Sequence, residues 1–472
     1  MRAFCLALII CGASLAVSGC GGGGGDAPPV PTNASAPPPR HPRGDPIKHV
    51  VLMIQENRTF NNLFAGFPGA ISSTTGEELV KVGTSYVKQQ VPLAETNLLA
   101  KGNLNHEYVA YQTAWQNGAM DGFNLIKYGT TGKPENAAPY QYVNPAKVAP
   151  YRQIASQWGL ADELFQTQGS GSFIAHQDLI RGGTSIDATH SLIDDPTSVA
   201  VWGCLSPPGA KTSLITTSGQ YQKRKGPFPC TTAFPYPSQY VTLADLMNAK
   251  GVSWKYYTPP PIKAQVGAIW NAYLVIASIC NGQGVCGSNV SSPEKNILFD
   301  ITSGALPAMS WVVPDAQNSD HPGYSSKDTG PSWVASVVNA IGKSQYWNST
   351  AVIVVWDDWG GFYDPVAPPF QDDQGGAGFR VPMLVISPYV KAGSGSRGGY
   401  ISNTVYGFGS IIRFVEDNWR LGRLGTTDQS STSIANMFNL KQSPRRFTKI
   451  SSPYDEQYFR RQKPSGLPVD TE

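Results

Sequence analysis

Short runs of consecutive apolar residues, rich in β-branched side chains and bounded by turn formers, recur along the chain at 49–54, 309–313, 351–356 and 383–386. Such runs are typical of strands that are covered on both faces, because a half-buried strand would alternate apolar and polar residues. Residues 332–342 and 409–418 place apolar side chains at helical spacing. The pattern predicts an α/β fold with a mostly parallel central sheet flanked by helices.

The stretch 187–296 differs from the rest, with many Pro, Gly, Ser and Tyr residues and little sustained periodicity. We interpret it as a cap-like insertion that borders the functional site, since its aromatic and cysteine content argues against a disordered segment. Disulfides between Cys204 and Cys230 and between Cys280 and Cys286 would staple it. This sequence-local pairing is one of the three connectivities that four cysteines allow.

The N-terminus has the pattern of an export signal. Met1-Arg2 is followed by a largely apolar run at 3–17, which is too short for a permanent membrane span. Residues 17–20 resemble a bacterial lipobox, so we expect residues 1–19 to be removed and Cys20 to carry a lipid. An ordinary signal peptide with an incidental cysteine is the alternative. The Gly- and Pro-rich residues 20–47 predict a flexible tether, and hence a membrane-anchored lipoprotein, periplasmic or of the outer membrane.

A net charge of +3 on 472 residues is too weak to indicate a nucleic-acid partner, because the basic residues are dispersed apart from those at 223–225. No later run approaches the roughly eighteen apolar residues of a membrane span. We therefore expect the N-terminal lipid to be the membrane contact. Residues 48–450 have the length and apolar content of one large domain, followed by a tail at 451–472.

Polar clusters directly follow two of the predicted strands. Glu56 and Asn57 come after the run at 49–54, and Asp357 and Asp358 come after the run at 351–356. Because ligands bind beyond the carboxyl ends of strands in open α/β sheets, the clusters should converge. Carboxylates packed together repel one another unless a cation lies among them, and their oxygens suit a divalent ion. A solvated turn or an acidic helix cap is the alternative for either cluster alone.

A serine nucleophile is predicted in the turn 168–172, which leads into a helix. A helix N-terminus favours both an alkoxide and an incoming phosphate. Local sequence alone leaves Ser170 or Ser172 better explained as a helix N-cap. The G-x-S-x-G elbow of α/β-hydrolases is missing from this turn.

Histidine is scarce, with six in the chain. His106, His176 and His321 are the candidates for proton transfer or phosphate contact. His321 follows a predicted strand, on the same rim as the acidic clusters. His176 lies one helical turn after Ser172, and we interpret it as a structural histidine.

At these residues the chain resembles the bacterial phosphoesterase family of acid phosphatases and phospholipases C, a branch of the alkaline phosphatase-like superfamily. Residues 55–64 look like its N-terminal signature, and residues 356–364 look like its acidic signature. Further matches lie, in family order, at 118–123, 169–183, 319–322, 380–389 and 409–416. The resemblance covers nearly all of residues 48–450.

The resemblance implies an alkaline phosphatase-like fold and one divalent metal ion. By position, the implied ligands are Glu56, Asn57, Ser172, Asp357 and Asp358. It also implies that Ser172, rather than Ser170, is the nucleophile, and that His106 and His321 contact the phosphate or serve the leaving group. The sequence departs from the family where Pro365 and Asn403 replace histidines, which bears on the pH optimum and on protonation.

The implied function is hydrolysis of phosphate esters through a phosphoserine. We favour an acid phosphatase, because the chain ends soon after the catalytic fold, without the C-terminal β-rich domains of longer phospholipases C. A phospholipase C-type phosphodiesterase is the alternative. A non-catalytic envelope lipoprotein that binds a phosphorylated ligand is the hypothesis from another class. A sulfatase is disfavoured, since its nucleophile motif is not present.

Overall fold

The computed structural model describes residues 45–99, 103–129, 131–196, 211–226, 240–260, 269–280, 286–323, 328–370, 376–393 and 398–467. The chain divides into two units, Met1–Arg40 and His41–Glu472, and the described residues all belong to the second. The predicted signal, the tether to residue 44, Cys20 and the pair Cys204–Cys230 lie outside the described residues.

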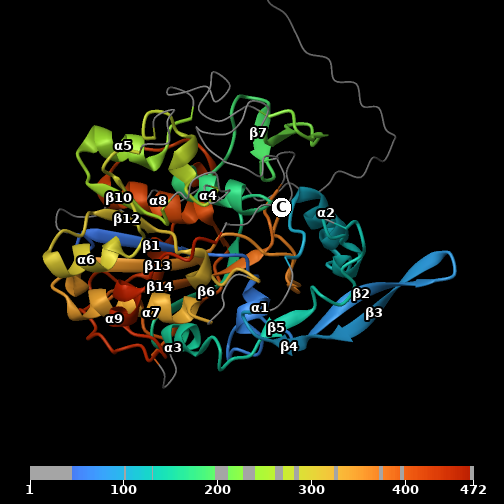
Figure 1. Ribbon diagram of the computed structural model, residues 1–472, viewed down its shortest axis with the longest axis horizontal. Coiled ribbons are helices and arrows are strands. Elements are labelled where there is room, and N and C mark those ends of the chain that lie inside the picture. The colour runs from blue at the N-terminus through green and yellow to red at the C-terminus, as the bar shows by residue number, and fades with distance from the viewer. Residues whose placement is uncertain are drawn as a thin grey trace, which may run out of the picture. The chain divides into compact units, whose positions relative to one another are not determined.

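A large mixed sheet runs through the second unit (Figure 1). In the described part of the chain it has nine strands, in the order β11-β10-β12-β1-β13-β14-β6-β15, with β16 also paired to β6. These strands are β1 (His49–Gln55), β6 (Gly159–Phe165), β10 (Trp254–Tyr257), β11 (Val290–Ser291), β12 (Met309–Val312), β13 (Thr350–Trp356), β14 (Arg380–Ile386), β15 (Tyr400–Ser402) and β16 (Tyr406–Gly407). All pairs are parallel except those of β14. The predicted fold class is therefore confirmed.

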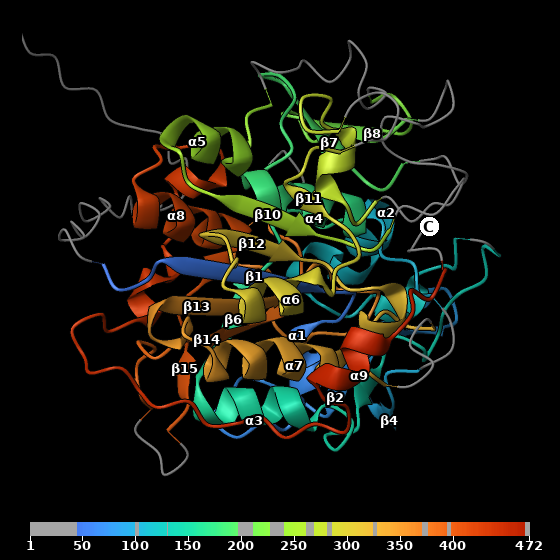
Figure 2. The same cartoon turned by 60° about the vertical axis from the view of Figure 1, so that its left-hand side comes forward.

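Helices cover both faces of this sheet. The α-helices of the described residues are α1 (Phe60–Phe64), α2 (Tyr108–Trp115), α3 (Ala149–Gln157), α4 (Ser172–Arg181), α5 (Leu243–Lys250), α6 (Asn296–Ser303), α7 (Gly330–Lys343), α8 (Phe408–Trp419) and α9 (Glu456–Arg461). Helices α4, α5 and α8 lie on one side of the sheet, and α3 and α7 lie on the other (Figure 2). Burial on both sides explains why β13 and β14 consist of buried residues throughout. The predicted helices at 332–342 and 409–418 correspond to α7 and α8.

The direction of β14 matters for the site. It runs antiparallel to both β13 and β6, so that its first residue, Arg380, pairs with Phe165 at the last position of β6. Arg380 thus lies at the edge of the sheet where the parallel strands end. This edge carries the acidic residues described below.

The stretch predicted as an insertion has two parts in the structure. Its first part forms a small antiparallel sheet of β7 (His190–Ile193), β8 (Ser213–Thr216) and β9 (Tyr221–Gln222). Its second part supplies α5, β10 and β11, and both strands belong to the central sheet. The aromatic residues of β10 favour a strand. This strand was not predicted, because it is short and the sequence around it is rich in Pro and Gly. The predicted disulfide Cys280–Cys286 is present.

A hairpin of β2 (Thr75–Val82) and β3 (Ser85–Pro92) projects from the body (Figure 1). Near its base, β4 (Ala94–Thr96) pairs with β5 (Gln141–Val143). A second apolar cluster packs here and includes Tyr111, Phe123, Trp359 and Phe379. Because Trp359 directly follows the acidic pair Asp357-Asp358, this cluster holds the acidic loop in place.

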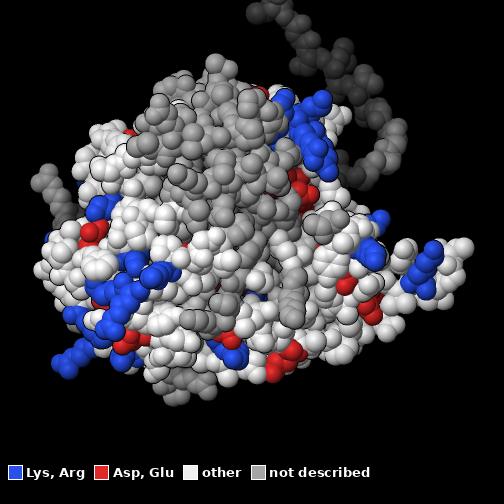
Figure 3. Space-filling view, viewed as in Figure 1, with Lys and Arg blue, Asp and Glu red and all other residues white. Residues whose placement is uncertain are grey.

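The surface and the helices give two further observations. Figure 3 shows Lys and Arg side chains in several separate groups, with acidic side chains among them, on the face in view. Within the described ranges we find no helix with both the length and the apolar composition that crossing a membrane requires.

Glu294 gives a pH-dependent prediction about stability. Its side chain is buried, and burial, with the charge of Asp315 adding to it, raises the pKa of the carboxyl group to about 8. The folded state therefore keeps this proton up to about pH 8, whereas the unfolded chain releases it near pH 4.5. The free energy of unfolding must fall as the pH rises between these values.

We expect Glu294→Gln, which cannot ionise, to remove this dependence. The melting temperature of the variant, relative to that of the wild type, should be higher at about pH 8.5 than at about pH 5, because only the wild type carries the buried charge at high pH. Thermal unfolding at both pH values measures the difference. A melting-temperature difference of the same size at both pH values would show that Glu294 does not titrate between about pH 5 and about pH 8.5.

Candidate active site

The edge of the sheet brings the two acidic clusters together. Strands β1 and β13 are parallel neighbours, and Gln55 pairs with Trp356 at their last positions. Glu56 and Asp357 therefore leave the sheet side by side. The side chains of Glu56, Asn57, Asp357 and Asp358 are fully buried.

A tight backbone approach fixes the two loops against each other. Asn57 has a φ of 48°, in the left-handed region that Asn tolerates better than most residues. Its backbone N–H donates to Asp357 Oδ1 at 3.0 Å. A Cβ atom at Gly360 would lie 2.2 Å from the carbonyl oxygen of Asn57, so this approach requires glycine.

Glu56, His176 and Asp357 form the first group of side chains in the site. Each offers one ligand atom, and these atoms lie within 4.8 Å of one another. His176 Nε2 is 2.9 Å from Glu56 Oε1 and 3.7 Å from Asp357 Oδ2. Burial lowers the pKa of the His176 imidazole to about 4, although the Asp357 charge opposes the shift. The ring is therefore neutral at physiological pH.

This first group fits a metal ion. Two carboxylates and a neutral imidazole are a donor set that transition-metal ions accept. Asp357 Oδ2 is buried and has no hydrogen-bond partner among the described residues. A buried carboxylate oxygen in this position is costly without a cation nearby. A divalent ion is the group that would satisfy it.

Ser172, Asn57, Asp358 and His106 form the second group. Ser172 Oγ donates to Asp358 Oδ2 at 2.9 Å. Asn57 Nδ2 lies 3.2 Å from Asp358 Oδ2 and 3.2 Å from Ser172 Oγ. All four side chains are fully buried. The hydroxyl of Ser172 thus points at a carboxylate rather than at solvent.

The tautomer of His106 follows from its partners. His106 Nδ1 lies 2.7 Å from the carbonyl oxygen of Leu104, which can only accept, so Nδ1 carries the proton. His106 Nε2 then accepts from Asn57 Nδ2 at 2.9 Å. The same Nε2 is 3.7 Å from Asp358 Oδ2. A basic nitrogen therefore lies beside the carboxylate that holds Ser172.

The two groups form one buried cluster. Asn57 contacts Asp357 through its backbone and Asp358 through its side chain. Ser172 and His176 are four residues apart on α4, which places both side chains on the same face of that helix. The structure thus brings together all the predicted metal ligands and adds His176. Its spacing of one helical turn from Ser172 was the sequence signal for its position beside them.

The structure also distinguishes the two serines of the turn. The N-cap residue of α4 is Gly171, and Ser172 is the first helical residue. Ser170 Oγ instead accepts from the backbone N–H of Asp194 at 2.8 Å. Ser170 therefore stabilises the turn, whereas Ser172 faces the cluster.

His321 is also fully buried. His321 Nδ1 is 2.9 Å from the carbonyl oxygen of Pro322. The ring of Trp270 lies 6.0 Å from the His321 ring and 6.5 Å from the His176 ring, between centroids. Both histidine rings thus lie near the same tryptophan.

The positions that depart from the family differ in exposure. Pro365 is half-buried and follows Asp364, whereas Asn403 is exposed. Asp364 forms a fully buried ion pair with Arg380, with Arg380 Nη2 3.0 Å from Asp364 Oδ1. The guanidinium also lies 4.4 Å from the centroid of the Phe60 ring. This pair attaches the acidic loop to β14.

A second acidic pair, Asp194-Asp195, was not recognised from the sequence. Asp195 Oδ1 accepts from the backbone N–H of Phe173 at 2.8 Å, in the first turn of α4. Asp194 Oδ1 accepts from the backbone N–H of Tyr108 at 2.6 Å. The pair therefore holds the segment that carries His106 against the turn that carries Ser172. Its signal was an acidic pair directly after the two apolar residues at 192–193, as the pair at 357–358 follows a longer apolar run.

Comparisons with known proteins add a family and several relatives. The model of the Phosphoesterase family matches residues 47–422. The non-hemolytic phospholipase C of Pseudomonas aeruginosa is 23% identical over 425 residues, which is 80% of this chain and 55% of that protein. The phospholipase C B of Mycobacterium tuberculosis is 24% identical over 427 residues, covering 78% of this chain and 72% of that protein.

The matches cover only part of each relative. This chain spans 55% of the length of the Pseudomonas aeruginosa relative and 58% of a non-hemolytic phospholipase C of Burkholderia pseudomallei. A solved structure of a protein in the alkaline phosphatase superfamily from Vibrio parahaemolyticus is 11% identical, with a TM-score of 0.32. It covers 58% of this chain and 62% of that one, a likeness too weak to support an argument about function.

Proposed function

Given that the chain belongs to the Phosphoesterase family, we propose that it hydrolyses phosphate esters, with Ser172 as the nucleophile. The observation that carries this proposal is the contact of 2.9 Å between Ser172 Oγ and Asp358 Oδ2 in a fully buried cluster. A hydroxyl held by a carboxylate at a helix N-terminus is suited to attack phosphorus.

We propose that one divalent metal ion completes the site. Glu56, His176 and Asp357 would hold it on one side, and Asn57, Ser172 and Asp358 lie directly beside them. When bound, such an ion supplies Lewis acidity, neutralising charge on the phosphoryl oxygens and lowering the pKa of a nearby hydroxyl group.

In the proposed reaction, Ser172 Oγ attacks phosphorus as the bond from phosphorus to the alcohol oxygen breaks. Asp358 Oδ2 takes the hydroxyl proton, and His106 Nε2, 3.7 Å away, can pass a proton on to the leaving oxygen. Water then attacks the phosphoserine and the bond between Oγ and phosphorus breaks. The proton lost by the water passes to Oγ, which restores Ser172 and releases the phosphate product. Asn57 orients Ser172, Asp358 and His106 through one side-chain amide.

Phosphomonoesters and phosphodiesters are two candidate substrate classes. The family that the sequence resembles contains both acid phosphatases and phospholipases C, and we propose the phosphomonoester of an acid phosphatase first. The relatives named phospholipase C favour a phosphodiester with a lipid group. Both classes use the same attack on phosphorus and differ in the groups attached to it.

Hydrolysis assays distinguish these candidates. We expect p-nitrophenyl phosphate to be hydrolysed faster than bis-p-nitrophenyl phosphate and phosphatidylcholine, with Ser172→Ala as the matched blank in each assay. Faster turnover of phosphatidylcholine, lost in Ser172→Ala, would assign a phospholipase C instead. Equal rates for wild type and blank on all three substrates would contradict the proposed hydrolysis of these classes and favour the non-catalytic binding protein.

A further inference from the structure

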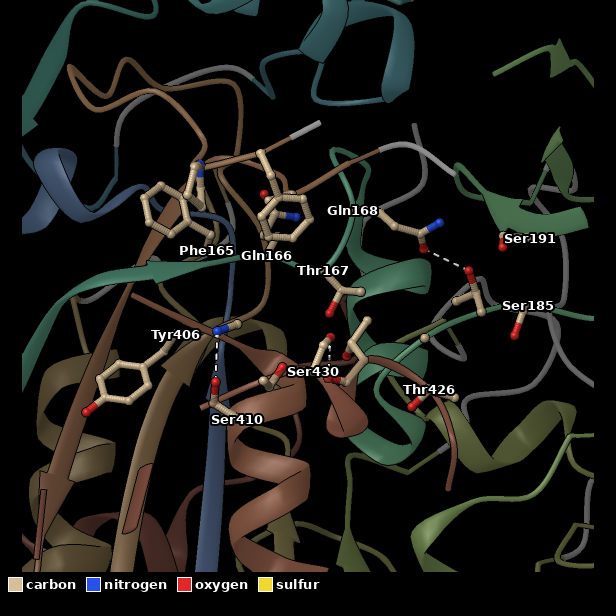
Figure 4. Close-up of a pocket in the computed structure, with 18 of the residues that line it drawn as sticks. Phe165, Gln166, Thr167, Gln168, Ser185, Ser191, Tyr406, Ser410, Thr426 and Ser430 are labelled. Atoms are coloured by element: carbon tan, nitrogen blue, oxygen red, sulfur yellow. Dashed lines mark hydrogen bonds between the residues drawn. The ribbon is translucent and has the colours of Figure 1, made fainter. Parts of the chain in front are cut away.

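A cavity of about 720 Å³ lies beyond the carboxyl end of β6 (Figure 4). Its walls come from the segment after β6, from the start of the predicted insertion, and from the chain segments that precede and follow α8. None of the side chains in the buried cluster lines it. It is therefore a second concave site, distinct from the cluster.

The lining of this cavity is rich in hydroxyl and amide groups. These include Thr167, Gln168, Thr184, Ser191, Ser410 and Ser430. Phe165, Phe370 and Tyr406 add aromatic rings. Among the described lining residues, Asp187 is the one charged side chain, and no Lys or Arg is present. Walls of this kind do not favour a free phosphate, which is bound by cationic groups and helix N-termini.

Two buried polar atoms of the wall have no hydrogen-bond partner among the described residues. Gln166 is 2% exposed, and its Oε1 has no hydrogen-bond partner among the described residues. Its Nε2 donates to the carbonyl oxygen of Ser170 at 3.0 Å, which fixes the amide orientation. Thr167 Oγ1 is buried and likewise has no partner there. Both atoms have almost no accessible surface, so the wall is polar below its surface as well as on it.

The cavity shares a turn with the nucleophile. Gln168 lies four residues before Ser172, and a chain of that length spans at most about 14 Å. The bond from Gln166 to Ser170 ties the cavity wall to the same turn. A group bound in the cavity is thus within reach of an ester attached at Ser172.

We propose that this cavity binds a neutral, polyhydroxylated group, such as a polyol or a sugar. Its hydroxyl groups would exchange hydrogen bonds with the Ser, Thr and Gln side chains of the lining, while its apolar face packs on the aromatic rings. The group is either the alcohol part of the phosphate ester or a free ligand. The first of these identities rests on the proposed function, and the binding itself does not.

Ser430→Phe, with Ser303→Phe as its control, tests this proposal. Both serines are exposed, and each donates to the carbonyl oxygen three residues earlier, at 3.4 Å. Ser430 lines the cavity, whereas Ser303 ends α6. Phenylalanine at 430 would add a bulky ring to the lining of the cavity, and no side chain of the buried cluster belongs to that lining.

Ligand-observed NMR with glycerol, myo-inositol and D-glucose at tens of millimolar measures binding directly. We expect at least one of them to bind to the wild type and to Ser303→Phe, and to lose binding in Ser430→Phe. Binding of none, or equal binding in Ser430→Phe, would overturn the proposal. This measurement needs no phosphatase activity, so it can fail or succeed independently of the proposed function.

Kinetics then identify the source of the group. If it is the alcohol part of the substrate, Ser430→Phe lowers kcat/KM about tenfold or more for glycerol phosphate or glucose 6-phosphate, and leaves p-nitrophenyl phosphate unchanged. If polyol binding is lost but these ratios do not change, the cavity binds a free ligand, which supports the site and excludes the substrate as its occupant.

Discussion

Ser172→Ala is expected to retain the wild-type fold and metal content and to lower turnover by about a thousandfold or more, which corresponds to about 4 kcal/mol of barrier. Ser172 Oγ is the atom that attacks phosphorus in the proposed reaction. Gly171, not Ser172, is the N-cap residue of α4, so removal of the hydroxyl leaves the helix cap intact. Kinetics on p-nitrophenyl phosphate, with thermal unfolding alongside, measure both effects.

Ser170→Ala is the matched control, because Ser170 lies in the same turn but bonds to Asp194. Loss of that buried hydrogen bond should cost about 1 kcal/mol of stability and leave kcat nearly unchanged. The opposite result, with normal turnover in Ser172→Ala and lost turnover in Ser170→Ala, would move the nucleophile to Ser170.

Asp357→Asn and Asp358→Asn should each lower metal affinity by about a hundredfold or more, because each replaces a charged oxygen donor with a neutral one. Wild-type protein should carry about one divalent ion per chain, lose activity on chelation and regain it when the ion returns. Elemental analysis of the purified proteins, followed by activity titration with added metal, measures both quantities.

Asp315→Asn is the control for these variants. Asp315 is also a buried carboxylate beyond the carboxyl end of a parallel strand, but it caps a short 3-10 helix, with Oδ1 accepting from the backbone N–H of Gln317 at 3.1 Å. It should keep the metal content of the wild type. Equal metal content in all three variants would place the ion elsewhere, and full activity in metal-free protein would exclude a role for it in catalysis.

The central sheet could be predicted because its strands are buried on both faces. Residues 351–356 and 383–386 contain few polar side chains, and this pattern gives the strand positions without knowledge of their order. The antiparallel direction of β14 has no such signal, since a strand buried on both faces has the same composition in either direction. Its consequence, the position of Arg380 at the active edge, required the structure.

The candidate site could be predicted in part for the same reason. Glu56 and Asp357 follow adjacent strands, so the rule that ligands bind beyond strand ends brought them together. His176 has a sequence signal, its spacing from Ser172, but a histidine in a helix is as readily a packed core residue. Its neutral state and its position between two carboxylates are properties of three-dimensional burial.

Contacts between segments far apart in the sequence explain why the role of Asp195 and the cavity were not predicted. Asp195 bonds to Phe173 across 22 positions of sequence, and this contact depends on the small sheet of β7 and β8. The cavity is likewise lined by segments around 166, 184 and 430, none of which has a periodic pattern. Short irregular segments carry little local information about where they pack.

Trapping of the covalent intermediate tests the central proposal most directly. Wild-type protein is mixed with p-nitrophenyl phosphate, quenched in acid during turnover and digested, and the phosphorylated peptide is identified by mass spectrometry. The proposed reaction predicts phosphate on Ser172 of wild-type protein and no phosphopeptide from Ser172→Ala. Phosphate on Ser170 alone, in an enzyme that turns over normally, would contradict it.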